Sequence, residues 1–342
     1  MATKNITTKI LITGISGFVG SHICEYILKN TNWDIVGLDN LNYAGNLNRF
    51  VDIDVWEREK NRVEFIYHDL EAPITELTHN MIGKVNYVIH LAAESVVSRS
   101  LANPILFIKS NILGTVNIIE YVRQYQTDVK AVISFSSDEV LGPTPIGQKF
   151  SEEQYLNPSS PYSVSKTCSE LISGAWQASY GLPIIIVRSS NIYGTKQYPD
   201  DFIPKTVKTI LENKKIELHG SPKNPSSRSW VHVEDVNSVL MFLLEHGNAG
   251  EVYHIEGEKK DIYWLSKEIF KIVKNGKELK KSDVLWIEKP YLGHDFNYVL
   301  KDTKLKKMGC EPKHKIEKGL EEIIKFMINK PIWLNIPKKV KT

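Results

Sequence analysis

Cysteine is scarce in this sequence, and the three that occur, Cys24, Cys168 and Cys310, lie far apart. No Cys-x-x-Cys pair or Cys/His spacing is present, so the sequence predicts neither a disulfide framework nor a metal site. The N-terminal stretch also lacks an apolar segment as long as a signal peptide needs. We therefore expect free thiols and a cytoplasmic protein.

Long apolar runs and an excess of one charge are missing as well. No run of about 18 apolar residues occurs, so we expect no membrane span. Lysine and arginine number 43 against 40 acidic residues, a net charge of +3, which gives no reason to expect nucleic acid or a membrane surface as a partner. The lysines at 338, 339 and 341 are expected to end a solvated tail.

What the sequence does contain is an alternation of short apolar runs with longer amphipathic stretches. The runs are nearly continuous in apolar residues, as in strands that are covered on both faces. Strand followed by helix, repeated, predicts an α/β fold: a Rossmann-type, doubly wound parallel sheet. The expected strands are 9–14, 34–40, 63–70, 85–93, 130–137 and 183–194, and the expected helices are 19–30, 104–125 and 163–181.

The pattern loosens after about residue 195, and Pro, Gly and Ser become frequent over 219–230. We predict a nucleotide-binding domain over 1–190, with returning segments near 231–260. A smaller, interleaved substrate-binding region is expected mainly over 191–330, and a tail over 331–342.

A glycine-rich turn, "LITGISGFVGSH", follows the first strand and opens the first helix. Gly14, Gly17 and Gly20 would let the backbone approach a pyrophosphate, with the helix N-terminus behind it supplying amide donors. Asp39 ends the second strand, where a carboxylate can accept both ribose hydroxyls and repel a 2′-phosphate. The sequence therefore predicts NAD as the cofactor, with Phe18 and Val19 in the same loop.

Two further strand ends extend the predicted cofactor site. Asp69 and Leu70 end the third strand, where an adenine would lie, and Ala92 and Ala93 follow the fourth, where small side chains let the cofactor pass. Each signal is weak alone, and their order along the chain carries the prediction.

The chemistry is expected at the end of the fifth strand and the start of the next helix. Tyr162 and Lys166 lie four apart, on one helical face, where an ammonium and a bound cofactor would lower the pKa of the phenol. Asp138 and Glu139 follow the apolar strand "AVISFSS" directly. Residue chemistry alone leaves open whether this acid pair is a solvated helix start or a proton donor and acceptor.

From about residue 8 to 325 the chain resembles the extended short-chain dehydrogenase/reductases that act on nucleotide sugars. "TGISGFVGSH" is similar to their cofactor loop and "YSVSK" to their Tyr/Lys pair. Within that family it resembles most the 4,6-dehydratases of dTDP-glucose. The stretches that carry this are "DNLNYAGNLNRF", "HLAAES", "SSDEVLG" and "LGHDFNYVL".

The resemblance implies a hydro-lyase with internal hydride transfer. Tyr162 would deprotonate the sugar 4-hydroxyl while NAD accepts hydride from carbon 4. Glu139 would remove the carbon 5 proton, and Asp138 would protonate the departing 6-hydroxyl, before hydride returns to carbon 6. Ser137 would bind the 4-oxygen. The two acids would need environments that separate their pKa values, and they must lie where the chain leaves the strand, because neighbours on a strand point to opposite faces.

The resemblance also suggests substrate contacts and a dimer. Arg228 and Asn191 would hold the diphosphate, and Glu94 and Ser95 would line the sugar pocket. The spare apolar faces of helices 104–125 and 163–181 would pair in a homodimer.

Departures from the family pattern keep alternatives open. "VVSRS" (96–100), "PDDFIP" (199–204) and "YLGHDFN" (291–297) lose residues usual in the dehydratases, cations among them, which puts the nucleotide in doubt. UDP-glucose and UDP-GlcNAc remain possible substrates beside dTDP-glucose. A nucleotide-sugar 4-epimerase, which needs no acid pair, and a non-catalytic NAD-binding sensor are the rival functions. A dehydrogenase with net consumption of NAD is disfavoured, since no cysteine lies in the catalytic stretches.

Overall fold

A computed structural model describes residues 7–288 and 297–334. The chain divides into two compact units, and each draws on three segments of sequence. Unit 1 comprises residues 1–140, 160–188 and 237–253, and unit 2 comprises 141–159, 189–236 and 254–342. Residues 141–159, which the sequence placed in the first domain, therefore cluster with unit 2. The predicted lysine tail at 338–341 lies outside the described residues.

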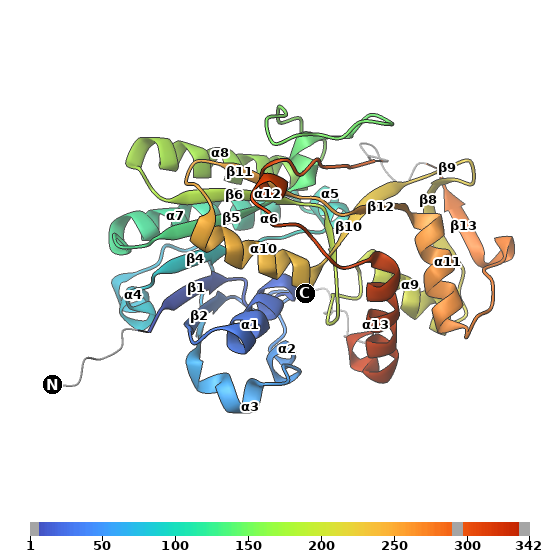
Figure 1. Ribbon diagram of the computed structural model, residues 1–342, viewed down its shortest axis with the longest axis horizontal. Coiled ribbons are helices and arrows are strands. Elements are labelled where there is room, and N and C mark those ends of the chain that lie inside the picture. The colour runs from blue at the N-terminus through green and yellow to red at the C-terminus, as the bar shows by residue number, and fades with distance from the viewer. Residues whose placement is uncertain (1–6, 289–296, 335–342) are drawn as a thin grey trace. The chain divides into compact units, whose positions relative to one another are not determined.

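The main sheet has seven strands, in the order β11-β6-β5-β4-β1-β2-β3 (Figure 1). The pairs of β1 with β2 and β4, of β2 with β3, and of β4 with β5 are all parallel. The strands are β1 (Lys9–Thr13), β2 (Asp34–Asp39), β3 (Val63–Tyr67), β4 (Tyr87–His90), β5 (Ala131–Ser137), β6 (Ile184–Ser189) and β11 (Val252–Ile255).

Helices connect these strands and cover the sheet. They are α1 (Phe18–Asn30), α2 (Asn48–Val51), α3 (Trp56–Glu59), η1 (Lys60–Arg62), α4 (Glu76–Ile82), α5 (Val97–Ala102), α6 (Pro104–Phe107), η2 (Ile108–Leu113), α7 (Gly114–Tyr125), η3 (Asp138–Leu141), α8 (Pro161–Tyr180) and α10 (Val233–His246). Apolar side chains of β1, β2, β4 and β5 pack with those of α7 in one buried cluster. The predicted Rossmann-type, doubly wound fold is confirmed.

The predicted helix 104–125 is not one regular helix. It consists of α6, one stretch of π-helix (η2) and α7. By length and composition the whole stretch could cross a membrane. Here Ile118, Ile119 and Val122 pack in the core of unit 1, and η2 and α7 contact α8. Burial in a protein core accounts for the same apolar composition.

Helix α8 shows how local sequence sets an element's bounds. Ser160 caps its N-terminus in a reciprocal box with Ser163, Pro161 occupies the first turn, and Gly181 ends it in the left-handed conformation. Each of these residue types is favoured at its position for a backbone reason. The helix therefore starts one residue before Tyr162, which fixes the place of that side chain in the first turn.

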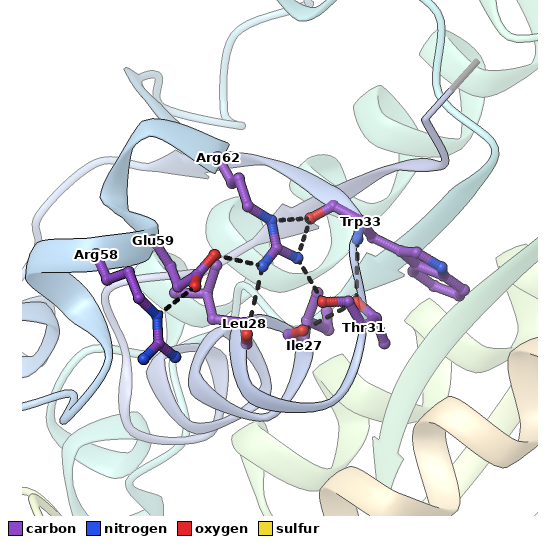
Figure 2. Close-up of polar contacts among 7 residues, drawn as sticks. All are labelled: Ile27, Leu28, Thr31, Trp33, Arg58, Glu59 and Arg62. Carbon is purple, nitrogen blue, oxygen red and sulfur yellow. Dashed lines mark hydrogen bonds and ion pairs between the residues drawn. The ribbon is translucent and has the colours of Figure 1, made fainter. Parts of the chain in front are cut away.

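The C-terminus of α1 is held by one arginine from a distant turn. Figure 2 shows Arg62 donating to the carbonyls of Leu28, Thr31 and Trp33 and pairing with Glu59. These carbonyls lie at or just beyond the end of α1, where no further helical N–H group can reach them. Arg62 thus ties the end of the cofactor helix to the segment that precedes β3.

Unit 2 contains two three-stranded sheets and a second core. One sheet has the order β12-β10-β7, and the other β13-β8-β9. Apolar residues of α9, α11 and α13 pack around Tyr193, Leu218 and Trp230. The elements are β7 (Asn191–Tyr193), α9 (Phe202–Leu211), β8 (Ile216–Ser221), β9 (Asn224–Pro225), β10 (Ser227–His232), β12 (Glu258–Asp261), α11 (Ile262–Val273), η4 (Lys281–Asp283), β13 (Val284–Ile287), α12 (Lys304–Lys307), α13 (Ile316–Asn329) and η5 (Pro331–Trp333).

Two sequence predictions differ from this arrangement. The expected strand 183–194 is broken after Ser189, and its end is β7, which pairs with β10 in a different sheet. Trp333 and Leu334, placed in a tail by the sequence, are buried in unit 2. The run 183–194 was predicted correctly as buried but not as divided between two sheets, and the prediction of a tail was wrong for Trp333 and Leu334.

Candidate active site

The glycine turn between β1 and α1 is shaped by backbone packing. Gly14 has φ of +71°, and a Cβ there would lie 2.8 Å from the backbone nitrogen of Ala92. A Cβ on Gly20 would overlap the Gly14 carbonyl and lie 2.7 Å from Cα of Ile15. Gly17 is the N-cap of α1 and has no side chain to satisfy the first amides of the helix. Phe18 and Val19 follow in the first turn, so the loop leaves amide donors for an anion.

Asp39 lies at the end of β2 beside this turn. Its Oδ2 accepts the backbone N–H of Ser16 at 3.0 Å and its Oδ1 accepts that of Leu41 at 2.8 Å. Each carboxylate oxygen keeps a second lone pair for a hydroxyl. The nearby Ser16 hydroxyl is buried and has no hydrogen-bond partner among the described residues. The hydroxyls of a dinucleotide's ribose could donate to the Asp39 carboxylate and hydrogen-bond the Ser16 hydroxyl. These residues therefore fit the predicted cofactor.

The remaining predicted cofactor residues also follow the parallel strands. Asp69 is exposed after β3 and accepts the backbone N–H of Glu71, whereas Leu70 is buried. Ala92 and Ala93 follow β4, and the N–H of Ala92 donates to the Thr13 hydroxyl at the end of β1. Since the carboxyl ends of parallel strands share one edge, these residues and the glycine turn lie at the same edge of the sheet.

The sequence missed Arg49 as part of this edge. Arg49 is fully buried, and its Nη1 donates to the carbonyls of Ser16 and Ala44. It thereby joins the segment after β2 to the glycine turn. No spacing rule could identify it, because an arginine in a polar segment usually lies on the surface.

Ser137, Asp138 and Glu139 occupy the end of β5 and the start of η3. The acids thus lie where the chain leaves the strand, as predicted. The Ser137 hydroxyl donates to Asp138 Oδ1 at 3.3 Å and accepts the backbone N–H of Glu139 at 3.2 Å. Asp138 is buried, and Glu139 is partly exposed. One turn therefore presents a hydroxyl and two carboxyl groups in different degrees of contact with solvent.

Tyr162 and Lys166 face this turn from α8. Tyr162 is buried, hydrogen-bonds Ser137 and feels the charges of Glu139 and Asp138. Lys166 is also buried, and its Nζ donates to the carbonyl of Phe135 at 2.5 Å. The structure therefore brings together the five residues that the sequence predicted as catalytic.

The predicted lowering of the Tyr162 pKa includes the charge of a bound cofactor, and in the protein without cofactor this pKa is raised. Burial raises this pKa, the negative charge of Glu139 raises it further, and the hydrogen bond with Ser137 lowers it. Burial lowers the pKa of Lys166 to about 8, while the carboxylate of Glu170 raises it. Lys166 thus acts mainly on the Phe135 carbonyl here, and a lowered phenol pKa requires positive charge that the protein alone does not provide.

Buried His90, at the end of β4, hydrogen-bonds the end of β1 and helix α7. His90 Nδ1 lies 2.7 Å from the Thr13 hydroxyl, and its Nε2 lies 3.1 Å from that of Thr115. Burial, with the charge of Lys166, lowers the pKa of His90 to about 3, so the ring is neutral. Thr115 donates to the carbonyl of Asn111, so it accepts the Nε2 proton and leaves Nδ1 as the acceptor from Thr13.

Glu94 and Ser95, the predicted sugar-pocket residues, lie in different environments. Ser95 is exposed, whereas Glu94 is buried, and its Oε1 accepts a hydrogen bond from Asn42. Burial raises the pKa of Glu94, and Arg99 lowers it. The backbone of Glu94 bonds both ends of the Asn111 amide, which also donates to Ser165 on α8. Asn111 in η2 thus fixes this loop to the catalytic helix.

Asn191 and Arg228 both belong to unit 2 and to one sheet. Asn191 of β7 is opposite Trp230 of β10, and Arg228 precedes Trp230 by two residues. Residues two apart on a strand share a face, so the two polar side chains lie on the same side of this sheet. The Arg228 guanidinium stacks over the Tyr298 ring at 4.8 Å and donates to the Ser227 carbonyl.

One group of possible metal ligands, His232, Glu234 and His314, lies in unit 2 among the described residues. The two imidazole rings stack at 4.4 Å with 25° between their planes. Ring lone pairs lie in the ring planes, so stacked rings do not direct them to one ion. His314 instead donates to Asp235 through both its backbone and its ring. These three residues therefore do not form a convergent ligand set.

The comparisons with known proteins agree with this geometry. The model of the NAD dependent epimerase/dehydratase family matches residues 10–255. The chain is 34% identical to the dTDP-glucose 4,6-dehydratase of Salmonella typhimurium, over 96% of this chain and 94% of that protein. The structure resembles two solved dTDP-glucose 4,6-dehydratases. That of Bacillus anthracis, in complex with NAD, has a TM-score of 0.83 and 31% identity, covering 96% of this chain and 98% of the other. DesIV of Streptomyces venezuelae, with NAD and TYD bound, has a TM-score of 0.86 and 30% identity, covering 95% and 98%.

Proposed function

Because this chain belongs to the NAD dependent epimerase/dehydratase family, we propose that it is an NAD-dependent nucleotide-sugar 4,6-dehydratase. The favoured substrate is dTDP-glucose, and the product is the 4-keto-6-deoxy sugar nucleotide. The observation that carries the proposal is the Ser137-Asp138-Glu139 turn facing Tyr162. An epimerase needs no acid pair at this place, whereas the loss of water needs both a proton acceptor and a proton donor.

The edge formed by the glycine turn, Asp39, and the ends of β3 and β4 would hold NAD. When bound, NAD supplies a hydride acceptor that is regenerated within the reaction. The residues of the chain contribute shape and donors here: amides of the α1 N-terminus for the pyrophosphate and the Asp39 carboxylate for a ribose.

Proton transfer is the task of the residues at the end of β5. Tyr162 accepts the proton of the 4-hydroxyl, and Ser137 holds the oxygen in place. Glu139, the more exposed acid, removes the proton on carbon 5, and buried Asp138 protonates the departing 6-hydroxyl. A carboxylate in contact with solvent stays ionised more readily than a buried one, which fits this division of roles.

We assign recognition of the nucleotide to unit 2, with Arg228 and Asn191 as candidates for the diphosphate. An arginine can bind phosphate oxygens in two places at once, and the Tyr298 ring under Arg228 fixes its plane. The fitting test is incubation with dTDP-glucose, UDP-glucose and UDP-GlcNAc in turn, with catalytic NAD and mass detection. A product lighter by one water, without NADH accumulation, supports the proposal and ranks the nucleotides.

Two other outcomes would contradict it. A new epimer of unchanged mass would make the protein a 4-epimerase and the acid pair a feature of the turn only. Tight NAD binding without turnover of any of the three sugars would favour a sensor.

We also propose a cytoplasmic homodimer. None of the three cysteines, all of which lie in the described part of the chain, forms a disulfide, as expected in a reducing compartment. Large apolar side chains are exposed along the two predicted dimer helices, among them Ile105, Ile108, Leu113, Val164 and Leu171. Light scattering after gel filtration tests this: Leu171→Glu should give a monomer, and the control Leu77→Glu, on exposed α4, should not. A wild-type monomer would contradict the dimer.

A further inference from the structure

Three consecutive residues of β5 each hold one residue of α8. The Ser137 hydroxyl bonds Tyr162, the Phe135 carbonyl accepts from Lys166, and the Ser136 hydroxyl donates to Glu170 Oε2 at 2.9 Å. Tyr162, Lys166 and Glu170 are spaced by four, so they line one face of α8. The Ser136–Glu170 contact differs from the other two, because neither of its residues takes part in the proposed proton transfers.

The Ser136–Glu170 contact is built into the core. Both residues are about 95% buried, and Arg188 of β6 pairs with both oxygens of the Glu170 carboxylate. This ion pair satisfies the charge of Glu170 without Ser136. The Ser136 hydroxyl is therefore not needed to neutralise Glu170. Its hydrogen bond instead fixes the position of β5 relative to α8.

We propose that Ser136 is a positioning residue, whose bond to Glu170 sets the end of β5 against α8 and so holds the Phe135 carbonyl at Lys166 and Ser137 at Tyr162. Ser136 lies between these two residues, so its backbone cannot shift without moving both. The inference rests on the proposed function, because the distance between Ser137 and Tyr162 matters only if they share a reacting hydroxyl.

The same strand and helix offer a matched control. Ser134 and Ser173 bond at 2.8 Å, again between β5 and α8 and again fully inside the core. Ser134 lies two residues before Ser136, on the same face of β5. It precedes Phe135, but it does not adjoin Ser137, and the carbonyl that holds Lys166 lies in the peptide unit between Phe135 and Ser136. A merely structural role would make Ser134→Ala and Ser136→Ala equivalent.

The test compares these two alanine variants in the full-length protein with NAD and dTDP-glucose. We expect Ser136→Ala to lower kcat roughly tenfold with KM within about twofold, since small misplacement of reacting groups costs rate rather than binding. In the profile of kcat against pH, the fall at low pH should begin at a higher pH in Ser136→Ala than in the wild type, because the pKa of Tyr162 is expected to rise. Ser134→Ala should retain the wild-type kcat and pH profile, and Ser136→Thr, which keeps the hydroxyl, should recover most of the loss. Equal effects of the two alanine variants, or no effect of Ser136→Ala, would overturn the inference.

A second readout needs no turnover. In protein labelled with ¹³C at tyrosine Cζ, the Tyr162 signal is identified by its absence from Tyr162→Phe and then titrated with NAD bound. The Tyr162 pKa should be higher in Ser136→Ala than in Ser134→Ala, and equal values would refute the positioning role. If the wild type converts none of the sugars, the proposed function fails, and this titration alone decides the inference.

Discussion

The ends of β1 and β5 lie at the same edge of one sheet but are built from different parts of the chain. At β1 the site is made of backbone: Gly14 and Gly20 are required because a Cβ would meet main-chain atoms. At β5 the site is made of side chains: Ser137, Asp138 and Tyr162 are buried, and the charges of Asp138 and Glu139 raise the pKa of Tyr162. The first end is determined by space and the second by electrostatic environment. The two ends should therefore fail in different ways when altered.

The largest expected effect is at β5 and on rate alone. Glu139→Gln should lower kcat by about 10²–10⁴, because the variant cannot accept the carbon 5 proton. The melting temperature and the dissociation constant for NAD should stay near wild type. Steady-state kinetics and calorimetry measure these quantities, with Glu153→Gln, an exposed acid, as control. Retained dehydration in Glu139→Gln would remove this residue from the mechanism.

At β1 the expected failure is one of packing. Gly20→Ala should lower the free energy of unfolding by about 2 kcal/mol and abolish NAD binding, because the new methyl group overlaps the Gly14 carbonyl. Gly174→Ala is the matched control, since nothing lies within 4 Å of a Cβ there. In the interior of α8 this change should stabilise by about 0.5–1 kcal/mol. Urea unfolding distinguishes the two, and similar stability of both variants would contradict the steric argument.

A charge can also be tested at the β1 edge. Asp39→Asn keeps the shape but removes the anionic acceptor, so NAD should bind about tenfold more weakly. Discrimination against NADP should fall at the same time, because the carboxylate no longer repels a 2′-phosphate. Titration calorimetry with both cofactors measures this. Unchanged affinity for NAD would mean that this end depends on backbone only.

The smallest expected effect is a change with pH in the free energy of unfolding, caused by Lys166 near the end of β5. Burial lowers the pKa of Lys166 to about 8 from 10.5 when folded, so the unfolded chain binds more protons between these values. The free energy of unfolding of the wild type, relative to Lys166→Met, should therefore rise by about 1 kcal/mol from pH 7 to 9. Denaturant titrations at both pH values check the sign. A constant difference would show that the ammonium is not penalised by burial.

Sequence reasoning found most of the fold and the residues at both strand ends. It succeeded where a signal is local: the strand runs, the glycine turn and the acids after β5. It failed for Arg49, His90 and Ser136, whose partners are distant in the chain. For Tyr162, spacing places Lys166 on the same helical face but does not reveal that Lys166 donates to Phe135, or that burial raises the Tyr162 pKa in the protein without cofactor.

By itself, the sequence determined the order of elements, the glycines that the first turn requires and the side chains at each strand end, because propensity, periodicity and turn chemistry act within a few residues. Only the tertiary structure decided that β7 leaves the main sheet, that Tyr162 is buried near the carboxyl groups of Asp138 and Glu139, and that three successive residues of β5 bond α8. Burial and electrostatic environment depend on segments far apart in the chain, and no local pattern records them.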